Sequence, residues 1–195
     1  LGDWNNEDSV YSVLIPTNRA WIAAYQRIKN YYKTTTAEGG SVRQDALTKK
    51  TLIQDLSFRQ SENPVLTGSV VSTIGHRFAI AEDLFYGAIQ NEVSNGLFFL
   101  TDSLRHKATE SWHREILVEA ENTDWGRTNL NANVFFRTSA GSGFSASGGK
   151  YITVEPTVLN DISEVSVTFP IPNTLSASYL IYCVFMPEII ADTSS

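Results

Sequence analysis

One group of side chains in this sequence has the spacing of a metal site. His106, Glu110 and His113 stand at positions i, i+4 and i+7, so on a helix they share one face and offer two imidazoles and a carboxylate to a cation. Three basic residues lie among and beside them, and their positive charge opposes a bound cation. The alternative is that residues 105–113 form a solvated connector, and the charge pattern favours this second interpretation.

A pair of carboxylates has a spacing that glycoside hydrolysis can use. Residues 115–121 alternate in a way that predicts a strand, and Glu119 and Glu121 then lie about 7 Å apart on one face. Hydrolysis needs two carboxyl groups that flank the scissile bond. Two glutamates on one strand approach a sugar from the same side, so we expect no enzyme here and keep a glycoside hydrolase only as the less favoured alternative.

Aromatic and amide side chains lie together in the polar loops of the second half of the chain. The faces of aromatic rings stack on the C–H faces of sugars, while amide and guanidinium groups bond to the hydroxyls. The alternative is that some of the rings cover the core of this half. The residues predicted to bind a glycan are Trp125, Arg127, Asn129, Asn131, Phe144 and Tyr151.

Other motifs that carry chemistry do not predict an active site. The glycine-rich stretch at residues 143–150 lacks the Lys and Ser/Thr of a phosphate-binding loop, and Gly-x-Ser-x-Gly does not occur. Cys183, the single cysteine, shares a strand face with Ile181 and Phe185 and is expected to be a buried, inert thiol. His76 follows a glycine in a predicted loop and has no assignable partner. We expect no catalytic residue and no cofactor.

Composition limits the partners of the chain. Its 195 residues are 42% hydrophobic and 18% charged, which predicts a globular protein with one large or two small domains. The formal charge is −6, and residues 109–195 carry all of it, with four basic and ten acidic side chains. This charge opposes binding to phosphates, so nucleic acid is excluded as a partner. The sequence contains no long apolar run and no signal-peptide pattern, and we expect any targeting segment to lie upstream.

The first half of the chain shows helical and extended patterns. Residues 10–15 predict a strand that Pro16 ends, and Thr17 can cap a helix. A second helix is expected after Ser41, followed from residue 58 by short extended segments. Asn95-Gly96 predicts a hairpin turn that leads into a buried strand at residues 97–100. The helix after Thr17 carries an apolar stripe made of Trp21, Tyr25, Ile28 and Tyr32.

The second half predicts short strands separated by turn-forming clusters, which is typical of an antiparallel β-sandwich. Residues 179–186 are apolar at successive positions and are expected to form a central strand, buried on both faces. The other predicted strands cover residues 115–121, 132–137, 150–154 and 164–169.

Two segments of the first half resemble the signatures of fasciclin-type domains. Residues 12–21 run from a strand into Pro-Thr-Asn and a helix, and residues 94–104 form a hairpin that ends in Asp-Ser-Leu. The resemblance covers about half the chain, residues 10–104. It implies an α+β fold in which the two signature strands are neighbours, within a fasciclin-like domain at residues 1–108 that is truncated at its N-terminus.

Residues 115–186 are similar to the opening half of β-sandwich carbohydrate-binding modules, which places a possibly partial sandwich domain at residues 109–195. By analogy with these modules, Glu119 and Glu121 are expected to bind a structural Ca²⁺, with a solvated acidic edge as the alternative. A fasciclin-type domain joined to such a sandwich resembles the surface lipoproteins of gut Bacteroidetes. The resemblance implies a location on the extracellular face of the outer membrane, with membrane attachment only through a lipid anchor outside this chain.

The function expected from these features is non-enzymatic adhesion at the cell surface or glycan binding. The expected partner is a polysaccharide or other glycan, or a surface protein. The alternative is a structural module that binds other proteins in a surface assembly.

Overall fold

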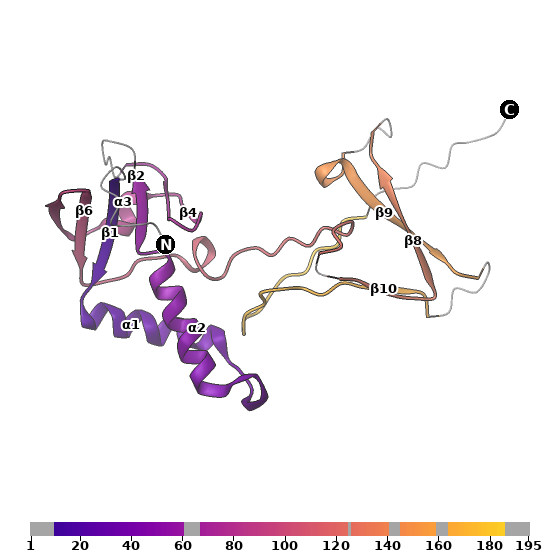
Figure 1. The fold of residues 1–195 in the computed structure, drawn as a ribbon, viewed down its shortest axis with the longest axis horizontal. Coiled ribbons are helices and arrows are strands. Elements are labelled where there is room, and N and C mark those ends of the chain that lie inside the picture. The colour runs from indigo at the N-terminus through magenta and orange to yellow at the C-terminus, as the bar shows by residue number, and fades with distance from the viewer. Residues whose placement is uncertain (1–9, 61–66, 125, 141–144, 159–163, 186–195) are drawn as a thin grey trace. The chain divides into compact units, whose positions relative to one another are not determined.

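The computed structural model describes residues 10–60, 67–124, 126–140, 145–158 and 164–185. The structure is mixed α/β, with a few helices and several small sheets (Figure 1), and its described part contains no closed barrel. The chain divides into two compact units. Unit 1 comprises Leu1–Glu115 with Leu175–Ala177, and unit 2 comprises Ile116–Thr174 with Ser178–Ser195.

A four-stranded sheet in the order β2-β1-β6-β5 organises unit 1. Strand β1 pairs in parallel with β6, from Tyr11 opposite Gly96 to Pro16 opposite Thr101, and both other pairings are antiparallel. Parallel strands need a long connection, and α1 and the segments after it supply it. The expectation that the two signature strands are neighbours is therefore confirmed. The strands are β1 (Val10–Pro16), β2 (Ser57–Gln60), β5 (Ile89–Val93) and β6 (Gly96–Thr101).

Helix α1 (Asn18–Lys29) starts directly after β1. The Thr17 side chain accepts a hydrogen bond from the Ala20 N–H at 3.3 Å, which confirms the predicted cap. The fully buried line consists of Ala20, Ala24 and Ile28, whereas Trp21 and Tyr25 are half-buried beside it. Trp21 and Tyr25 of the predicted stripe thus flank the buried line, because the small alanines allow α1 to lie close to the core.

Helix α2 (Gly40–Gln54) packs against α1. Its N-cap is Gly39, which has a φ of 104°, so the predicted cap at Ser41 is wrong. A short 3₁₀ turn, η2 (Thr36–Glu38), precedes the helix. Thr35 and Glu38 form a capping box at this turn, whereas the N-cap of α2 itself makes no side-chain hydrogen bond.

The remaining elements of unit 1 are short. Strands β3 (Val70–Val71) and β4 (Arg77–Phe78) pair with each other and confirm the extended pattern after residue 58. Helix α3 (Ala81–Phe85) was not predicted, because five residues are too few to show a helical period. Two further 3₁₀ turns are η1 (Asn30–Tyr32) and η3 (Ala108–Glu110).

Two apolar clusters form the core of unit 1. The first contains Leu14, Phe58, Val70, Phe78, Ala81, Leu84, Phe85, Leu97 and Phe99. The second contains Ala24, Ile28, Leu52, Leu104 and Trp112. His106 is 8% exposed, Ser111 3% and Trp112 9%. The charge pattern favoured a solvated connector at residues 105–113. This interpretation is wrong, because Trp112 anchors the segment against α1 and α2.

Unit 2 has two separate two-stranded sheets, β8-β9 and β10-β7. Strand β8 pairs antiparallel with β9, and Val134 lies opposite Val154 in their register. The described residues do not confirm a β-sandwich. The elements are β7 (Thr128–Leu130), β8 (Ala132–Thr138), the turn η4 (Ser147–Gly149), β9 (Lys150–Pro156) and β10 (Ser166–Thr168).

Two predicted strands of unit 2 are wrong. Residues 115–121 and 178–185 have no strand assignment, and residues 180–185 are exposed rather than central. A strand needs a partner for its backbone N–H and C=O groups, and neither segment has one among the described residues. Residue 186, the last of the predicted central strand, lies outside the described part.

Candidate functional site

A buried polar network lies at the end of α2 in unit 1, where sequence patterns gave no signal. Asp55 follows the helix and is 1% exposed. Its carboxylate oxygen Oδ2 accepts hydrogen bonds from Nδ1 of His76, at 2.9 Å, and from the hydroxyl of Ser111. Its backbone carbonyl accepts a hydrogen bond from Nε2 of His106 at 2.8 Å. Asp55 thus joins three segments far apart in the sequence and supplies the partner of His76 that the sequence did not reveal.

Burial favours the neutral form of the His106 imidazole in this network. Loss of hydration lowers the pKa of His106, against the weaker opposing effects of the Asp55 carbonyl and carboxylate. A carbonyl oxygen only accepts hydrogen bonds, so Nε2 carries the proton in the neutral ring. The role of His106 is to hold the backbone where α2 ends.

The network does not have the arrangement of a nucleophilic triad. In a triad the imidazole lies between the carboxylate and the hydroxyl and takes the hydroxyl proton. Here His76 and Ser111 both donate to the same oxygen of Asp55. The Ser111 hydroxyl therefore has a carboxylate as its partner, and the contacts stabilise the fold of unit 1 rather than activate a nucleophile.

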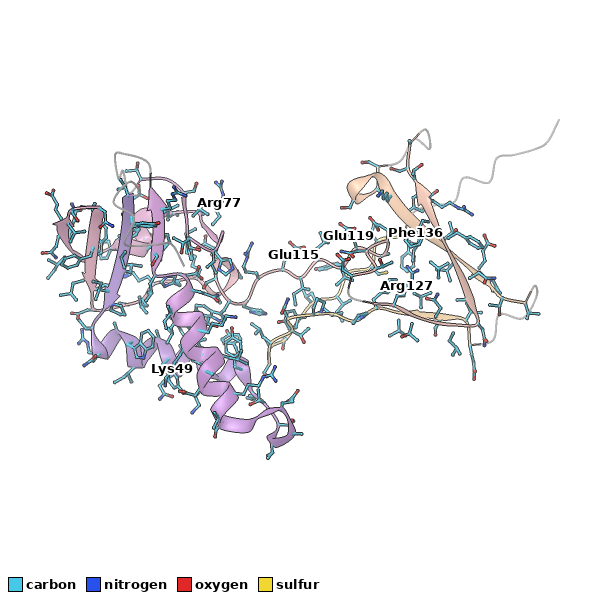
Figure 2. The ribbon with its side chains drawn as sticks, in the orientation of Figure 1. Lys49, Arg77, Glu115, Glu119, Arg127 and Phe136 are labelled. Atoms are coloured by element: carbon cyan, nitrogen blue, oxygen red, sulfur yellow. The ribbon has the colours of Figure 1, made fainter. Side chains whose placement is uncertain are left out.

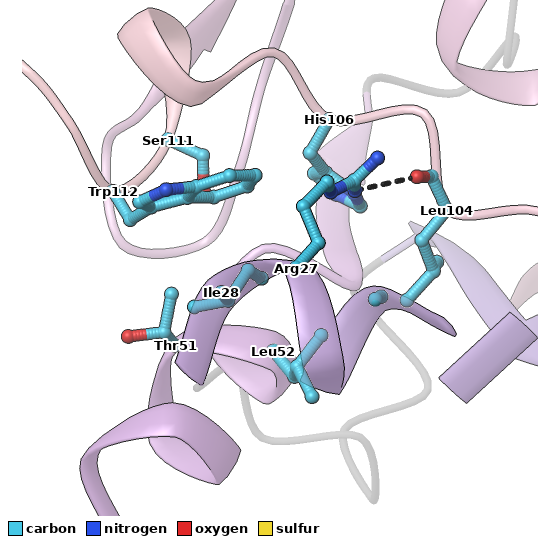
Figure 3. Close-up of a pocket in the computed structure, with 9 residues that line it drawn as sticks. Arg27, Ile28, Thr51, Leu52, Leu104, His106, Ser111 and Trp112 are labelled. Carbon is cyan, nitrogen blue, oxygen red and sulfur yellow. Dashed lines mark hydrogen bonds between the residues drawn. The ribbon is translucent and has the colours of Figure 1, made fainter. Parts of the chain in front are cut away.

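A small cavity borders this network (Figure 3). Its volume is about 10 Å³, close to the space that one water molecule occupies. Arg27 donates a hydrogen bond to the Leu104 carbonyl at 2.9 Å, and its guanidinium lies 5.5 Å from the centre of the Trp112 ring. The indole N–H of Trp112 is buried and has no partner. A space of this size accommodates a solvent molecule and excludes a substrate.

The three residues of the predicted metal group have other partners. Oε1 of Glu110 accepts a hydrogen bond from the Ala79 N–H at 3.1 Å, and His106 bonds to Asp55. The His113 ring lies against Tyr31, with 5.6 Å between the ring centres. Within the described ranges, no three His, Cys, Asp or Glu side chains are placed to hold a metal ion.

Glu119 and Glu121 both approach the turn η4. The Ser147 hydroxyl donates to Oε1 of Glu119 at 2.5 Å, and a Cβ at Gly148 would lie 3.9 Å from Oε1 of Glu121. Residues 120 and 121 form a turn, so the two side chains do not lie on one face of a strand as expected. A structural Ca²⁺ at these carboxylates stays a prediction.

The residues predicted to bind a glycan are distributed along unit 2. Trp125 and Phe144 lie outside the described residues. The guanidinium of Arg127 donates to the Ala120 carbonyl at 3.0 Å and lies 5.4 Å from the centre of the Phe136 ring. Arg127 and Phe136 are labelled in Figure 2. Arg127 thus uses part of its hydrogen-bonding capacity and one face of its guanidinium within the protein.

The remaining three glycan-site residues do not converge. Asn129 is exposed on β7, and Asn131 is exposed directly before β8 with a φ of 49°. Tyr151 lies on β9 opposite Arg137, which is near the other end of β8. At about 3.3 Å per residue, the length of β8 places Tyr151 roughly 15–20 Å from Asn131. The structure therefore keeps the two asparagines near each other and separates them from Tyr151.

The most prominent exposed surface of unit 2 is apolar. Residues 180–185 include five large apolar side chains that are 80 to 88% exposed. Cys183 is exposed within this segment, so the expectation of a buried thiol is wrong, because the strand that should bury it does not form. One face of the β8-β9 ribbon is also apolar, except for Thr138 and Lys150 at one end, and its apolar side chains are Ala132, Val134, Phe136, Ile152, Val154 and Pro156.

Comparison with protein-family models, curated proteins and solved structures found no match to this chain. In the part of the chain that the structure describes, no helix has the length and apolar character needed to cross a membrane. The geometry of the two units therefore carries what can be inferred about function.

Proposed function

We propose that this chain is a non-enzymatic, protein-binding module of a cell-surface assembly, and that unit 2 provides the binding surface. The observation that carries the proposal is the exposure of the apolar segment at residues 180–185. Soluble proteins rarely expose a continuous apolar patch of this kind unless it binds a partner. In this proposal unit 1 is a fasciclin-type domain, which the parallel pairing of β1 with β6 supports.

The contrast between the two units supports this assignment. Unit 1 buries two apolar clusters, whereas Ala132 is the only buried apolar side chain among the described residues of unit 2. Phe136 is 54% exposed and Val154 43% exposed on the apolar face of the β8-β9 ribbon. A two-stranded ribbon is at best marginally stable without a packed face. A partner that covers this face would complete unit 2 as the sandwich that the sequence pattern predicts.

Site-specific photocrosslinking on cells that make the protein tests the proposal. A photoreactive amino acid replaces Tyr182, which is 81% exposed in unit 2, and in a second chain it replaces Val42, which is 79% exposed on α2. We expect a discrete protein adduct from position 182 and none from position 42, because only the first lies on the proposed surface. Absence of any protein adduct at position 182, or equal adducts at both positions, would contradict the proposal.

Glycan binding is a second candidate function. The side chains of Asn129 and Asn131 are exposed and separated by one residue, which leaves their amide groups available to sugar hydroxyls. We expect a glycan array to identify a ligand that the Asn129→Ala and Asn131→Ala variants bind at least tenfold more weakly. An array without any bound glycan, or binding unchanged in both variants, would remove this candidate.

A further inference from the structure

Residues 180–185 have the properties of a β-strand that lacks a neighbour. The segment consists of Leu-Ile-Tyr-Cys-Val-Phe, with no charge, Gly or Pro, and β-branched and aromatic side chains favour strands. All six residues are exposed, from Leu180 at 83% to Phe185 at 84%. Short apolar segments of this type pair readily with an open sheet edge.

Unit 2 also contains an open sheet edge of matching length. Strand β9 has seven residues and pairs on one side with β8, while the described residues provide no strand on its other side. Strand β8 has β7 next to its start, because only Asn131 separates the two strands in sequence. The outer edge of β9 is therefore the more accessible edge of the β8-β9 ribbon.

We infer that residues 180–185 of one copy of this chain add as a strand beside β9 of a second copy. This inference rests on the proposed function and names its partner. Side chains alternate between the faces of a strand, so three of the six side chains extend the apolar face of the β8-β9 ribbon. The backbone N–H and C=O groups of both edges become paired in the same step.

The surface available to this contact is large enough for a stable interface. Tyr182 and Phe185 are 81% and 84% exposed, and aromatic side chains of this kind each bury about 150–250 Å². Leu180, Ile181 and Val184 each contribute roughly 60–120 Å², from the usual free energy of burying such side chains. Because the side chains alternate between two faces, one contact buries only part of this area, and the two reciprocal contacts of a dimer together reach about 1,000 Å², the lower bound for a specific interface.

Charge and composition favour a second copy as the partner. Each copy carries both the apolar segment and the open edge of β9, so no other component is needed. The chain has a formal charge of −6, which disfavours close approach of two copies through acidic surfaces. Residues 180–185 contain no charged side chain, and the apolar face of the β8-β9 ribbon has one, Lys150, at its end. These two surfaces therefore meet without charge repulsion.

Sedimentation equilibrium of the purified full chain tests self-association. The matched variants are Val184→Asp and Val42→Asp, since both positions carry an exposed valine, at 88% and 79%. We expect dimers or longer assemblies of the native chain at tens of micromolar. Val184→Asp should raise the dissociation constant at least tenfold, whereas Val42→Asp should leave it within twofold. A native chain that stays monomeric at about 100 μM, or equal effects of the two variants, would overturn the inference.

Disulfide trapping tests the strand that is contacted. Cys183 is the single cysteine, so a mixture of the native chain with a Val154→Cys, Cys183→Ser chain can form a mixed disulfide only between copies. Neighbouring strands hold opposite Cα atoms about 4.5–5.5 Å apart, within the range that a disulfide spans. An Ile152→Cys, Cys183→Ser chain tests the alternative register, in which Cys183 lies opposite residue 152. We expect a mixed disulfide from at least one of the two, and none from a Thr36→Cys, Cys183→Ser control.

Two further results separate this inference from the proposed function. A Val154→Cys chain that forms its disulfide with its own Cys183 would show pairing within one copy and overturn the inference. A photocrosslink from position 182 to a different protein, with a native chain that stays monomeric, would also overturn it and leave the proposed function intact. Absence of any adduct at position 182 would contradict both the inference and the proposed function.

Discussion

Substitution of Gly96 by alanine should strongly destabilise unit 1. Gly96 has a φ of 142°, a region that only glycine adopts at little cost, and it lies opposite Tyr11 where β6 begins. A Cβ at this position would approach the Tyr11 carbonyl oxygen to 1.9 Å and the Tyr11 nitrogen to 2.8 Å. Both are backbone atoms, so no side-chain rotation relieves the contact and the two strands must separate locally.

The expected loss of stability follows from these contacts. Separation of the strands breaks the hydrogen bond from the Tyr11 N–H to the Asn95 carbonyl, which is 3.0 Å long. One such bond contributes about 1 kcal/mol, and the backbone strain costs about 1–3 kcal/mol. With some loss of packing around Leu97, which is 8% exposed, we expect the free energy of unfolding to fall by about 3–5 kcal/mol.

Urea unfolding of the full chain, followed by tryptophan fluorescence, measures this effect, because Trp112 is 9% exposed in the core of unit 1. The matched control is Gly87→Ala. Gly87 also has a positive φ, of 73°, but a Cβ there meets no heavy atom within 4 Å. The control should lose only about 1–2 kcal/mol from its backbone conformation. If the free energies of unfolding of the two variants differ by less than about 1 kcal/mol, β1 does not pass Gly96 at the distance described.

Two other predictions concern the buried network of Asp55. The Asp55→Ala variant leaves the donors of His76 and Ser111 without an acceptor. We therefore expect the free energy of unfolding to fall by about 2–4 kcal/mol. The control Asp102→Ala, at an exposed site, should lower it by about 0.5 kcal/mol or less. Equal losses in urea unfolding would show that the network contributes nothing. The pKa of His106 is lowered by burial, so the unfolded chain takes up a proton at a higher pH than the folded one. Stability should therefore fall as the pH drops below about 6.5. Unfolding measured at several pH values should show a shallower fall for His106→Gln, and an unchanged slope would refute this role.

The elements of unit 1 that the sequence predicted are those with strong local signals. Pro16 and Thr17 mark the end of a strand and the start of a helix, and Asn95-Gly96 marks a hairpin, so β1, α1 and β6 follow from short stretches of sequence. The parallel pairing of β1 with β6 is a long-range contact. It was expected only because the two segments resemble the signatures of one family.

The errors arose where tertiary contacts decide the structure. The charges beside His106 indicated a solvated segment, yet the burial of Trp112 draws residues 105–113 into the core. Asp55 bonds to His76, which lies 21 positions later in the sequence, and to Ser111, which lies 56 positions later. Periodicity does not detect contacts over such separations. In unit 2 the apolar pattern of residues 180–185 is that of a central strand, but the described residues supply no adjacent strand. The apolar pattern does not show whether a neighbouring strand is present, so the predicted central strand is wrong for residues 180–185.

The topology of the four-stranded sheet has a consequence for how the protein folds during synthesis. Strand β1 pairs with residues 57–60 on one side and with residues 96–101 on the other, so its neighbours are translated long after it. Helices α1 and α2 pack on each other within one short stretch and can form early. One edge of β1 must therefore stay unpaired until residue 101 has left the ribosome, and an unpaired strand edge is prone to aggregation during this time.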